Sequence, residues 1–383
     1  MNTQDHQRNY GKNILIAADY CTPRSGNFIA SMLDLADALR AEGRQTIFLF
    51  PDRAKSSPWT SWLTSNGYPV FYLNEKAAGE ETLSFIRELV TRHEICLIHL
   101  HFGLLVSLLL PVHKALGVEL VIHDHFDFVT TSNPVRQRLS VIKKALLYRK
   151  HDAYCISVME KKNRWYWLSG KKHHSFIING LSLRRAEQDL LTREERRQEI
   201  GLQDGEKLAL FLGWDMERKG LDIAIKAVEF FRKTDPSLKL GVIGVGNDGK
   251  PSARAEQFLR NKGIDPNTDA VIYMHSYEDI FALNRAADCY ISSSRAEAFS
   301  YGILEAISQN TPVVVSDITG TGWCWEYSNA YRYAVEDPED CARAFQKALS
   351  AGRAPSNSAA LVAKYGNDVW CRRILAVYRQ LLG

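Results

Sequence analysis

The sequence predicts an α/β protein built from two doubly wound parallel sheets, and three observations support this. The chain has 383 residues, of which 45% are apolar and 24% charged, which at roughly 150 residues per domain suits two globular domains with separate cores. Apolar runs of strand length alternate with segments of helical period along the whole chain, a pattern typical of βα units. The runs fall into two series of similar size, with a boundary near residues 175–185.

The first series begins close to the N-terminus. Its clearest helix is Phe28–Ala41, where apolar residues recur on one face and Gly43 is placed to end the helix. This helix follows the first strand through a short loop, residues 19–27. Strands are expected at residues 13–18, 45–50, 69–73, 95–100, 118–122 and 153–157.

The second series has the same alternation, with helices expected at residues 220–233 and 252–262, and residues 367–382 read as a terminal amphipathic helix. Open parallel sheets bind ligands beyond the carboxyl ends of their strands, so two facing sheets would hold a ligand in a cleft between their loops. Strands are expected at residues 175–178, 207–213, 238–243, 270–273, 288–292 and 312–316.

Composition argues against several classes of protein. The longest apolar candidate, residues 102–112, is far shorter than the roughly 20 residues of a spanning helix. Residues 1–13 are polar and lack the features of a secretory signal, so a cytoplasmic location is expected. The seven cysteines are scattered and form no C-x-x-C pair, so they are expected to be buried free thiols. A net charge of +4 gives no reason to expect nucleic-acid binding.

The charge is unevenly distributed. Residues 136–172 contain eleven Lys or Arg against two acidic residues, a local charge of +9, with Trp165, Tyr166 and Trp167 among them. Such a segment can be a solvated helix face or a site for an anionic acceptor. It also suits the boundary of an anionic membrane, where basic side chains meet headgroups and aromatic side chains enter the interface. Peripheral association with the inner face of the membrane is thus the third interpretation of this segment.

The most informative string is Ser292-Ser-Ser-Arg-Ala-Glu-Ala-Phe-Ser-Tyr-Gly-Ile-Leu-Glu-Ala306, which follows the apolar run Cys289–Ile291. It reads as a strand, a turn of small residues and a helix beginning near Ser300. The amides at the start of such a helix form a site for phosphate. Glu297 precedes the helix and Glu305 lies about two turns along it, so a ligand at the helix start could meet both carboxylates.

This string resembles the E-x7-E signature of the retaining nucleotide-sugar glycosyltransferases of family 4, which have the GT-B fold. The resemblance implies two facing Rossmann-like domains, an acceptor domain at 1–176 and a donor domain at 177–365, with a C-terminal helix at 366–383 that packs back on the first. It also implies roles for individual residues. Glu297 would contact the donor sugar, Phe299, Ser300, Tyr301 and Gly302 the diphosphate, and Glu305 the ribose hydroxyls.

A second segment extends the resemblance. Phe211-Leu-Gly-Trp-Asp-Met-Glu-Arg-Lys-Gly220 is similar to the family's strand, glycine and basic pair, which assigns Gly213, Arg218 and Lys219 to the donor site. The chain has no D-x-D metal motif, so the charge that develops on the leaving diphosphate must be met by these cations and by helix amides. No metal or other cofactor is expected. The alternative is that Arg218 and Lys219 only lie at the start of the helix that follows and bind no ligand.

The first half of the chain adds three candidates. Thr22-Pro-Arg-Ser-Gly-Asn-Phe28 resembles the family's glycine-rich first loop, which implies that Gly26 and Asn27 lie against donor and acceptor; a plain turn and helix cap is the alternative. The strand ending at Ile122 is followed by His123, where the family places a polar group near the reacting face of the donor sugar. His123 is therefore a candidate catalytic residue, or a structural histidine at the end of a strand.

Two motifs compete with this interpretation. Gly244-Val-Gly-Asn-Asp-Gly249 matches the dinucleotide fingerprint G-x-G-x-x-G, although Pro251 interrupts a helix there. His99-x-His101 and His123-x-His125-x-Asp127 contain possible metal ligands. Metal-dependent hydrolases place such a pair on their first strand, whereas here it follows several βα units, so metal chemistry is disfavoured.

The sequence therefore predicts a retaining glycosyltransferase that needs no metal. It would move a sugar, with a UDP-sugar favoured as donor, to a hydroxyl of a glycan, lipid-linked or protein acceptor in cell-envelope or exopolysaccharide assembly. A non-catalytic glycosyltransferase-like subunit that binds sugar or protein is the alternative. A nucleotide-dependent oxidoreductase, based only on the glycine loop, is the third.

Overall fold

A computed structural model describes residues 12–22, 24–125, 134–158, 168, 170, 173–186, 191–275, 280–353 and 356–383; the side chains of 134, 136–138 and 356 are outside this description. The chain forms two compact units. The first domain contains residues up to Asn179 together with Trp370–Gly383, and the second contains Gly180–Val369. Among the described helices, none has the length and apolar character needed to cross a bilayer.

The first domain is built on a parallel sheet of seven strands in the order β3-β2-β1-β4-β5-β6-β7. The order reverses between β1 and β4, which are neighbours in the sheet although two other strands separate them in the chain. The strands are β1 Asn13–Ala18, β2 Thr46–Pro51, β3 Val70–Leu73, β4 Ile95–His101, β5 Glu119–Asp124, β6 Tyr154–Ser157 and β7 His174–Phe176.

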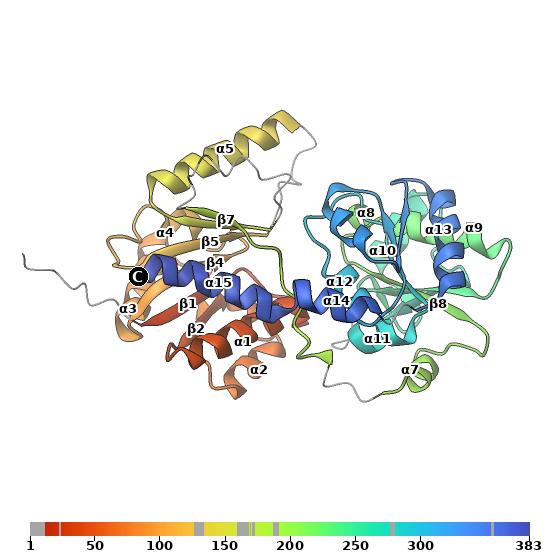
Figure 1. Cartoon of the computed structure of the whole chain (residues 1–383), viewed down its shortest axis with the longest axis horizontal. Coiled ribbons are helices and arrows are strands. Elements are labelled where there is room, and N and C mark those ends of the chain that lie inside the picture. The colour runs from red at the N-terminus through yellow and green to blue at the C-terminus, as the bar shows by residue number, and fades with distance from the viewer. Residues whose placement is uncertain are drawn as a thin grey trace, which may run out of the picture. The chain divides into compact units, whose positions relative to one another are not determined.

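Helices cover both faces of this sheet because its strands are apolar on both sides (Figure 1). Ile14 and Ile16 of β1 lie in a core with α1 and α15, whereas Leu15 and Ala17 lie in a second core with α3 and α5. The helix α15, at the end of the chain, thus packs on the first domain. The helices are α1 Gly26–Ala41, α2 Trp59–Ser65, α3 Gly79–Arg92, α4 Val106–Leu109, α5 Pro134–Lys150 and α15 Asn367–Leu382, with a 3-10 turn at Asp52–Ala54.

The second domain repeats this plan with a parallel sheet of six strands in the order β12-β9-β8-β13-β14-β15. Its order reverses between β8 and β13. The strands are β8 Lys207–Leu212, β9 Leu238–Ile243, β12 Val271–Met274, β13 Cys289–Ser292, β14 Val313–Ser316 and β15 Ala330–Tyr333. The helices are α7 Arg193–Glu199, α8 Met216–Lys219, α9 Leu221–Arg232, α10 Ala253–Asn261, α11 Ile280–Ala286, α12 Tyr301–Ser308, α13 Pro338–Ala351 and α14 Ser356–Tyr365, with a 3-10 segment at Thr319–Glu326.

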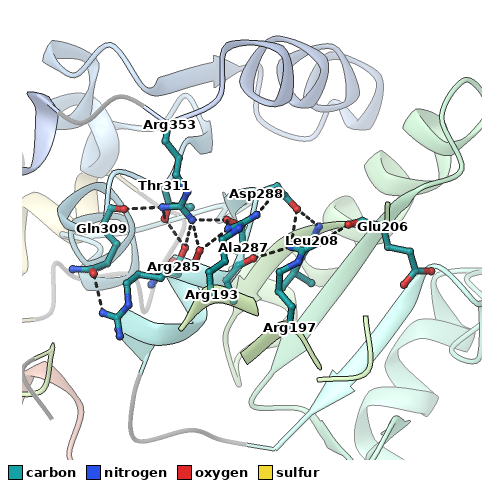
Figure 2. Close-up of polar contacts among 12 residues, drawn as sticks. Arg193, Arg197, Glu206, Leu208, Arg285, Ala287, Asp288, Gln309, Thr311 and Arg353 are labelled. Carbon is teal, nitrogen blue, oxygen red and sulfur yellow. Dashed lines mark hydrogen bonds and ion pairs between the residues drawn. The ribbon is translucent and has the colours of Figure 1, made fainter. Parts of the chain in front are cut away.

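Three arginines fasten the end of α11 to its surroundings (Figure 2). The last carbonyl oxygens of a helix lack donors within the helix. Here the N–H groups of the three guanidinium groups donate to them. Arg353 donates to the backbone oxygens of Asn284, Arg285, Ala287 and Gln309 and to the Thr311 hydroxyl; Arg193 and Arg197 bond neighbouring carbonyls and the Asp288 carboxylate. Burial, followed by repulsion from Arg193, lowers the pKa of Arg353 to about 10, so the group remains charged at neutral pH.

Most predicted strands and helices are confirmed, and the differences concern two strands and one cysteine. The run expected to open the second series is β7, which pairs with β6 and completes the first sheet. β15 was not predicted because only its last residue, Tyr333, is buried and its apolar signal is weak. Cys21 is exposed, so the prediction that every cysteine is buried is wrong there; it lies in the loop after β1, where its Sγ accepts a hydrogen bond from Arg53 Nε at 3.1 Å.

Candidate functional site

The candidate site of the second domain lies where the order of its sheet reverses. β8 and β13 are neighbours, and the chain leaves their carboxyl ends in opposite directions, which is where doubly wound sheets bind ligands. Gly213 directly follows β8, and residues 293–300 follow β13. Both segments that the sequence assigned to the donor site therefore meet at this edge of the sheet.

The loop after β8 forms a short helix that carries the basic pair. Asp215 caps α8 by accepting a hydrogen bond from the backbone N–H of Arg218 at 3.3 Å. A side chain at position 213 would crowd Lys219, because a Cβ there would lie 2.7 Å from Cγ of Lys219. Arg218 and Lys219 thus form the last turn of α8, just before α9, and are not simply the first residues of α9.

Two residues of the loop after β13 hold it against α8. The Ser293 hydroxyl lies 3.0 Å from the carbonyl oxygen of Lys219 and 2.9 Å from that of Gly220. The backbone N–H of Arg295 donates to the carbonyl oxygen of Arg218 at 2.8 Å. These backbone contacts fix where the two basic side chains begin.

The basic pair converges on Glu297. Lys219 Nζ donates to Oε1 of Glu297, and Arg218 Nη1 lies 3.4 Å from Oε2. The Ser294 hydroxyl donates to Oε1 at 2.8 Å. Burial by itself would raise the pKa of Glu297, but Lys219, Arg218 and the Ser294 hydroxyl outweigh it, so the pKa lies below its usual value. Glu297 is thus a buried, ionised carboxylate held between two cations.

The helix α12 begins as the sequence predicted, with Ser300 at its N-cap. The Ser300 side chain makes no capping hydrogen bond. Gly302 packs on β13, since a Cβ there would lie 2.2 Å from the hydroxyl oxygen of Tyr290. Phe299 is buried with its ring centroid 4.8 Å from that of Trp323, and Tyr301 is half-buried. The start of α12 is therefore fixed by packing.

Glu305, on the second turn of α12, forms a buried ion pair that the sequence did not predict. Arg185 Nη1 donates to Oε1 of Glu305 at 3.2 Å, and both residues are buried. The Arg185 guanidinium also lies 5.7 Å from the ring centroid of Phe281. Arg185 is 120 positions from Glu305 in the chain, and no motif marks it, so only the fold brings the two together.

The first-domain candidates occupy the corresponding edge of the other sheet. Gly26 begins α1 with a positive φ of 56°, and a Cβ there would lie 2.9 Å from the Tyr20 hydroxyl oxygen. Asn27 is buried and its Nδ2 donates to Oγ of Ser31 at 3.2 Å. Ser25 precedes the helix without capping it through its side chain. Gly26 is thus required by the tight turn, and one hydrogen bond of the Asn27 side chain stays within α1.

His123 lies in a cluster of four histidines, His99, His101, His123 and His125. Its Nδ1 is 3.3 Å from Nε2 of His99, and its ring stacks on that of His125 with centroids 4.2 Å apart. Burial, with repulsion between the rings, lowers the pKa of His123, and the pKa of His99 falls to about 3. His123 is only 2% exposed, so a sugar could reach its ring only after neighbouring side chains moved.

The competing glycine loop does not form a dinucleotide-binding turn. Gly246–Asn247 pairs with Lys250–Pro251 as a small antiparallel hairpin, β10 and β11. The next helix, α10, begins only at Ala253, after Ser252 caps it. Among the residues that the structure describes, no helix begins against these glycines, which removes the structural context of the oxidoreductase interpretation.

Part of the second domain resembles a known protein family. Residues 192–366 match the family model described as Glycosyl transferases group 1. A D-inositol 3-phosphate glycosyltransferase of Corynebacterium efficiens is 32% identical over 130 residues, covering 33% of this chain and 30% of that protein. The lipopolysaccharide glucosyltransferase WaaG of Escherichia coli is 30% identical over 130 residues, covering 34% and 33%. The chain thus spans about a third of the length of the first curated relatives it matches.

Solved structures match almost the whole chain. A glycosyltransferase from Rickettsia africae superimposes with a TM-score of 0.76 at 13% identity, covering 97% of this chain and 99% of that one. Anabaena HepE in complex with UDP gives a TM-score of 0.74 at 17% identity, covering 96% and 99%. This chain has the GT-B fold. Within it, the second domain carries the match to the glycosyl transferases group 1 model, and the site at β8 and β13 lies inside the matched residues.

Proposed function

We propose that the protein is a retaining glycosyltransferase that transfers a sugar from a UDP-sugar to an acceptor hydroxyl. The donor would bind the second domain of the GT-B fold, at the carboxyl ends of β8 and β13, and the acceptor would bind the first. The observation that carries this is the convergence of Arg218 and Lys219 on Glu297 directly before the N-terminus of α12. UDP is favoured because the similar Anabaena HepE was solved with UDP and with UDP-glucose.

Each group has a chemical task in this proposal. The amides at the start of α12, from Phe299 to Gly302, would accept the diphosphate, because a helix N-terminus favours an anion. Glu305 would bond the ribose hydroxyls, and Glu297 would contact the donor sugar. The ion pairs with Glu297 hold Arg218 and Lys219 in position, so little reorganisation is needed when the diphosphate arrives.

Transfer with retention would proceed by attack on the face from which the nucleotide leaves. The acceptor oxygen bonds to the anomeric carbon as the bond to the diphosphate oxygen breaks, and the acceptor proton passes to the departing diphosphate. Arg218, Lys219 and the α12 amides stabilise the charge that develops there. These fixed cations supply the role that a metal plays in other transferases, so transfer is expected to be independent of metal and to survive EDTA.

The first domain is proposed to contribute residues at the edge where the order of its own sheet reverses. Gly26 and Asn27 lie at the carboxyl end of β1, where the order of that sheet reverses, and would approach the donor and acceptor. The contact of His123 with the donor sugar remains a prediction, and the burial of the ring makes it depend on movement of the cluster. A role in cell-envelope or exopolysaccharide assembly is supported by relatives named for lipopolysaccharide synthesis.

Membrane association through α5 is the second part of the proposal. Val135, Leu139 and Leu146 are each more than half exposed and recur at intervals of four and seven residues, which places them on one face of the helix. Exposed basic residues, among them Lys143 and Lys150, flank this face. Trp165, Tyr166, Trp167 and most of the other basic residues of 136–172 lie outside the described residues. An apolar stripe beside basic groups suits an anionic bilayer surface.

Vesicle co-sedimentation tests the membrane proposal. Replacement of Leu139 and Leu146 by Ser should weaken binding to anionic vesicles at low salt, because it removes contacts that salt does not screen. Replacement of Val335, an exposed apolar residue of the second domain, by Ser is the matched control. Absence of binding by the unmodified protein, or equal loss in the control, contradicts the proposal.

The donor proposal is tested by a thermal-shift panel of UDP, GDP, ADP and NAD. A ligand that binds only the folded state stabilises it and so raises the melting temperature. At a concentration 100 times the dissociation constant, the gain in folding free energy is about 2.7 kcal/mol. UDP should give the largest shift. Binding of UDP without any turnover of UDP-sugars would point instead to a non-catalytic subunit. A shift with NAD alone would overturn the proposal.

A further inference from the structure

The four histidines of the first domain come from two adjacent strands. His99 and His101 are two residues apart on β4, so their side chains share one face of the sheet. His123 on β5 lies directly opposite His101 in the parallel register. The alternation of β4 and its pairing with β5 therefore place three imidazoles on the same patch of the sheet, beneath Trp370 and Tyr378 of α15.

These three rings offer nitrogen atoms to a common point. One ring nitrogen from each of His99, His101 and His123 lies within 4.8 Å of the other two, and all three residues are buried. Within the described residues, Nε2 of His101 and Nε2 of His123 are buried and have no hydrogen-bond partner. A buried polar atom without a partner is costly, so Nε2 of His101 points to a missing ligand. In His123 it is Nδ1 that faces His99.

The opposite nitrogens of two of these rings are already held. Nδ1 of His99 lies 2.6 Å from the Tyr378 hydroxyl oxygen, and Nδ1 of His101 lies 2.8 Å from Nε2 of His125. Histidines that bind a metal almost always use their second nitrogen in such a hydrogen bond, which fixes the tautomer and the ring orientation. The bonds to Tyr378 and His125 leave Nε2 of His99 and of His101 as the metal-binding atoms.

The spacing of one pair of ring nitrogens suits a small divalent ion. With Zn–N bonds of about 2.0–2.1 Å, tetrahedral geometry places neighbouring ligand nitrogens about 3.4 Å apart. Nε2 of His99 and Nδ1 of His123 are 3.3 Å apart. Imidazole ligands without carboxylate or thiolate favour zinc and neighbouring transition metals over magnesium or calcium.

We propose that His99, His101 and His123 bind one zinc ion, with a solvent molecule in the fourth position. The ion would tie β4 to β5 and, through Tyr378, to α15. It would have no part in stabilising the departing diphosphate, which is proposed for Arg218, Lys219 and the α12 amides of the second domain. Binding of zinc through Nδ1 would leave only Nε2 of His123 for a contact with a sugar hydroxyl.

Titration of the full chain with Co²⁺ tests the site, because Co²⁺ reports its ligands by absorption and can be replaced by Zn²⁺. We expect one ion per chain with a tetrahedral spectrum that lacks a thiolate charge-transfer band. His101→Phe keeps the aromatic packing and should weaken binding by more than the roughly 10- to 100-fold that loss of an outer hydrogen-bond partner costs. Tyr378→Phe removes such a partner and should cost that smaller factor.

His93→Phe is the matched control. His93 belongs to the same domain, packs against an aromatic ring, Phe71, and also has a buried Nε2 without a partner, but it stands outside the cluster. Melting temperatures in EDTA show whether each variant is folded. His123→Gln, which keeps a polar side chain, serves as a second ligand variant if His101→Phe does not fold.

The result that overturns the proposal is equal binding by the unmodified protein, His101→Phe and His123→Gln, or no stoichiometric binding at all. A thiolate band that disappears in Cys21→Ser would place the ion on the exposed cysteine and would also overturn it. EDTA should lower the melting temperature of the unmodified protein and leave that of His101→Phe unchanged. Because this readout is independent of sugar transfer, failure of the zinc site and failure of the donor site are distinguishable.

Discussion

Replacement of Lys219 by Met is the sharpest test of the donor site, because it should affect catalysis and stability by different mechanisms. Lys219 donates to the Glu297 carboxylate, which is 7% exposed, and Arg218 remains 3.4 Å from the other carboxylate oxygen. Met keeps most of the aliphatic length that packs on Gly213 but removes the positive charge.

The two magnitudes follow from these contacts. Loss of one hydrogen bond to a charged group costs about 1.5–3 kcal/mol of folding stability. The lower half of this range is expected, because Arg218 and Ser294 still stabilise the carboxylate. Loss of one preorganised donor to the transition state costs about 3–4 kcal/mol. The second figure corresponds to a fall of roughly 150- to 1,000-fold in kcat/KM.

The assay measures initial rates of UDP release and urea unfolding on the same preparations. Lys207→Met is the matched control, since Lys207 begins β8, at the opposite end of the strand from Gly213, and pairs with Asp235 at 2.7 Å near the surface. An exposed pair of this kind contributes about 0–1 kcal/mol. The control should therefore turn over normally. Equal kcat/KM for Lys219→Met and Lys207→Met would refute the role of Lys219.

The pH dependence of stability provides an independent check. The folded-state pKa of Glu297 is below its ordinary value, so its interactions add stability above the unfolded-state pKa and lose it as the pH falls through the folded-state pKa. Lys219→Met raises the folded-state pKa. The deficit of the variant in unfolding free energy should thus be greatest near neutral pH and should shrink on acidification. A deficit that does not change with pH would mean that Lys219 acts without the Glu297 charge.

Three further predictions concern single residues. Arg353→Met should destabilise the second domain by about 1–3 kcal/mol in urea unfolding, because the Gln309 carbonyl then loses the donor shown in Figure 2. Glu305→Gln should raise the dissociation constant for UDP in calorimetry, since a carboxylate can accept from two ribose hydroxyls and an amide only partly replaces it; an unchanged constant would remove Glu305 from the ribose site. Gly302→Ala should cost about 1–3 kcal/mol of stability by overpacking against Tyr290, and a neutral effect would show that the backbone of α12 can shift.

The local pattern of the chain was sufficient to predict most of the fold. Strand and helix periods are properties of short segments, and fully buried strands such as Asn13–Ala18 are marked by continuous apolar runs. The position of Ser300 at the start of α12 was also predictable, because a strand, a turn of small residues and a helix follow one another within a few residues. The short strands β7 and β15 were harder, since their burial depends on which neighbour they pair with.

Tertiary structure alone decided which distant side chains meet. Arg185 and Glu305 form an ion pair across 120 positions, and nothing in the residues around Arg185 distinguishes it from other arginines. The histidines were visible in the sequence as two short patterns, but their convergence required β4 and β5 to be neighbours in a fixed register. A period in the sequence gives the face of an element on which a residue lies. The packing of that face against a distant segment depends on the free energy of the whole fold, and therefore only the fold revealed these contacts.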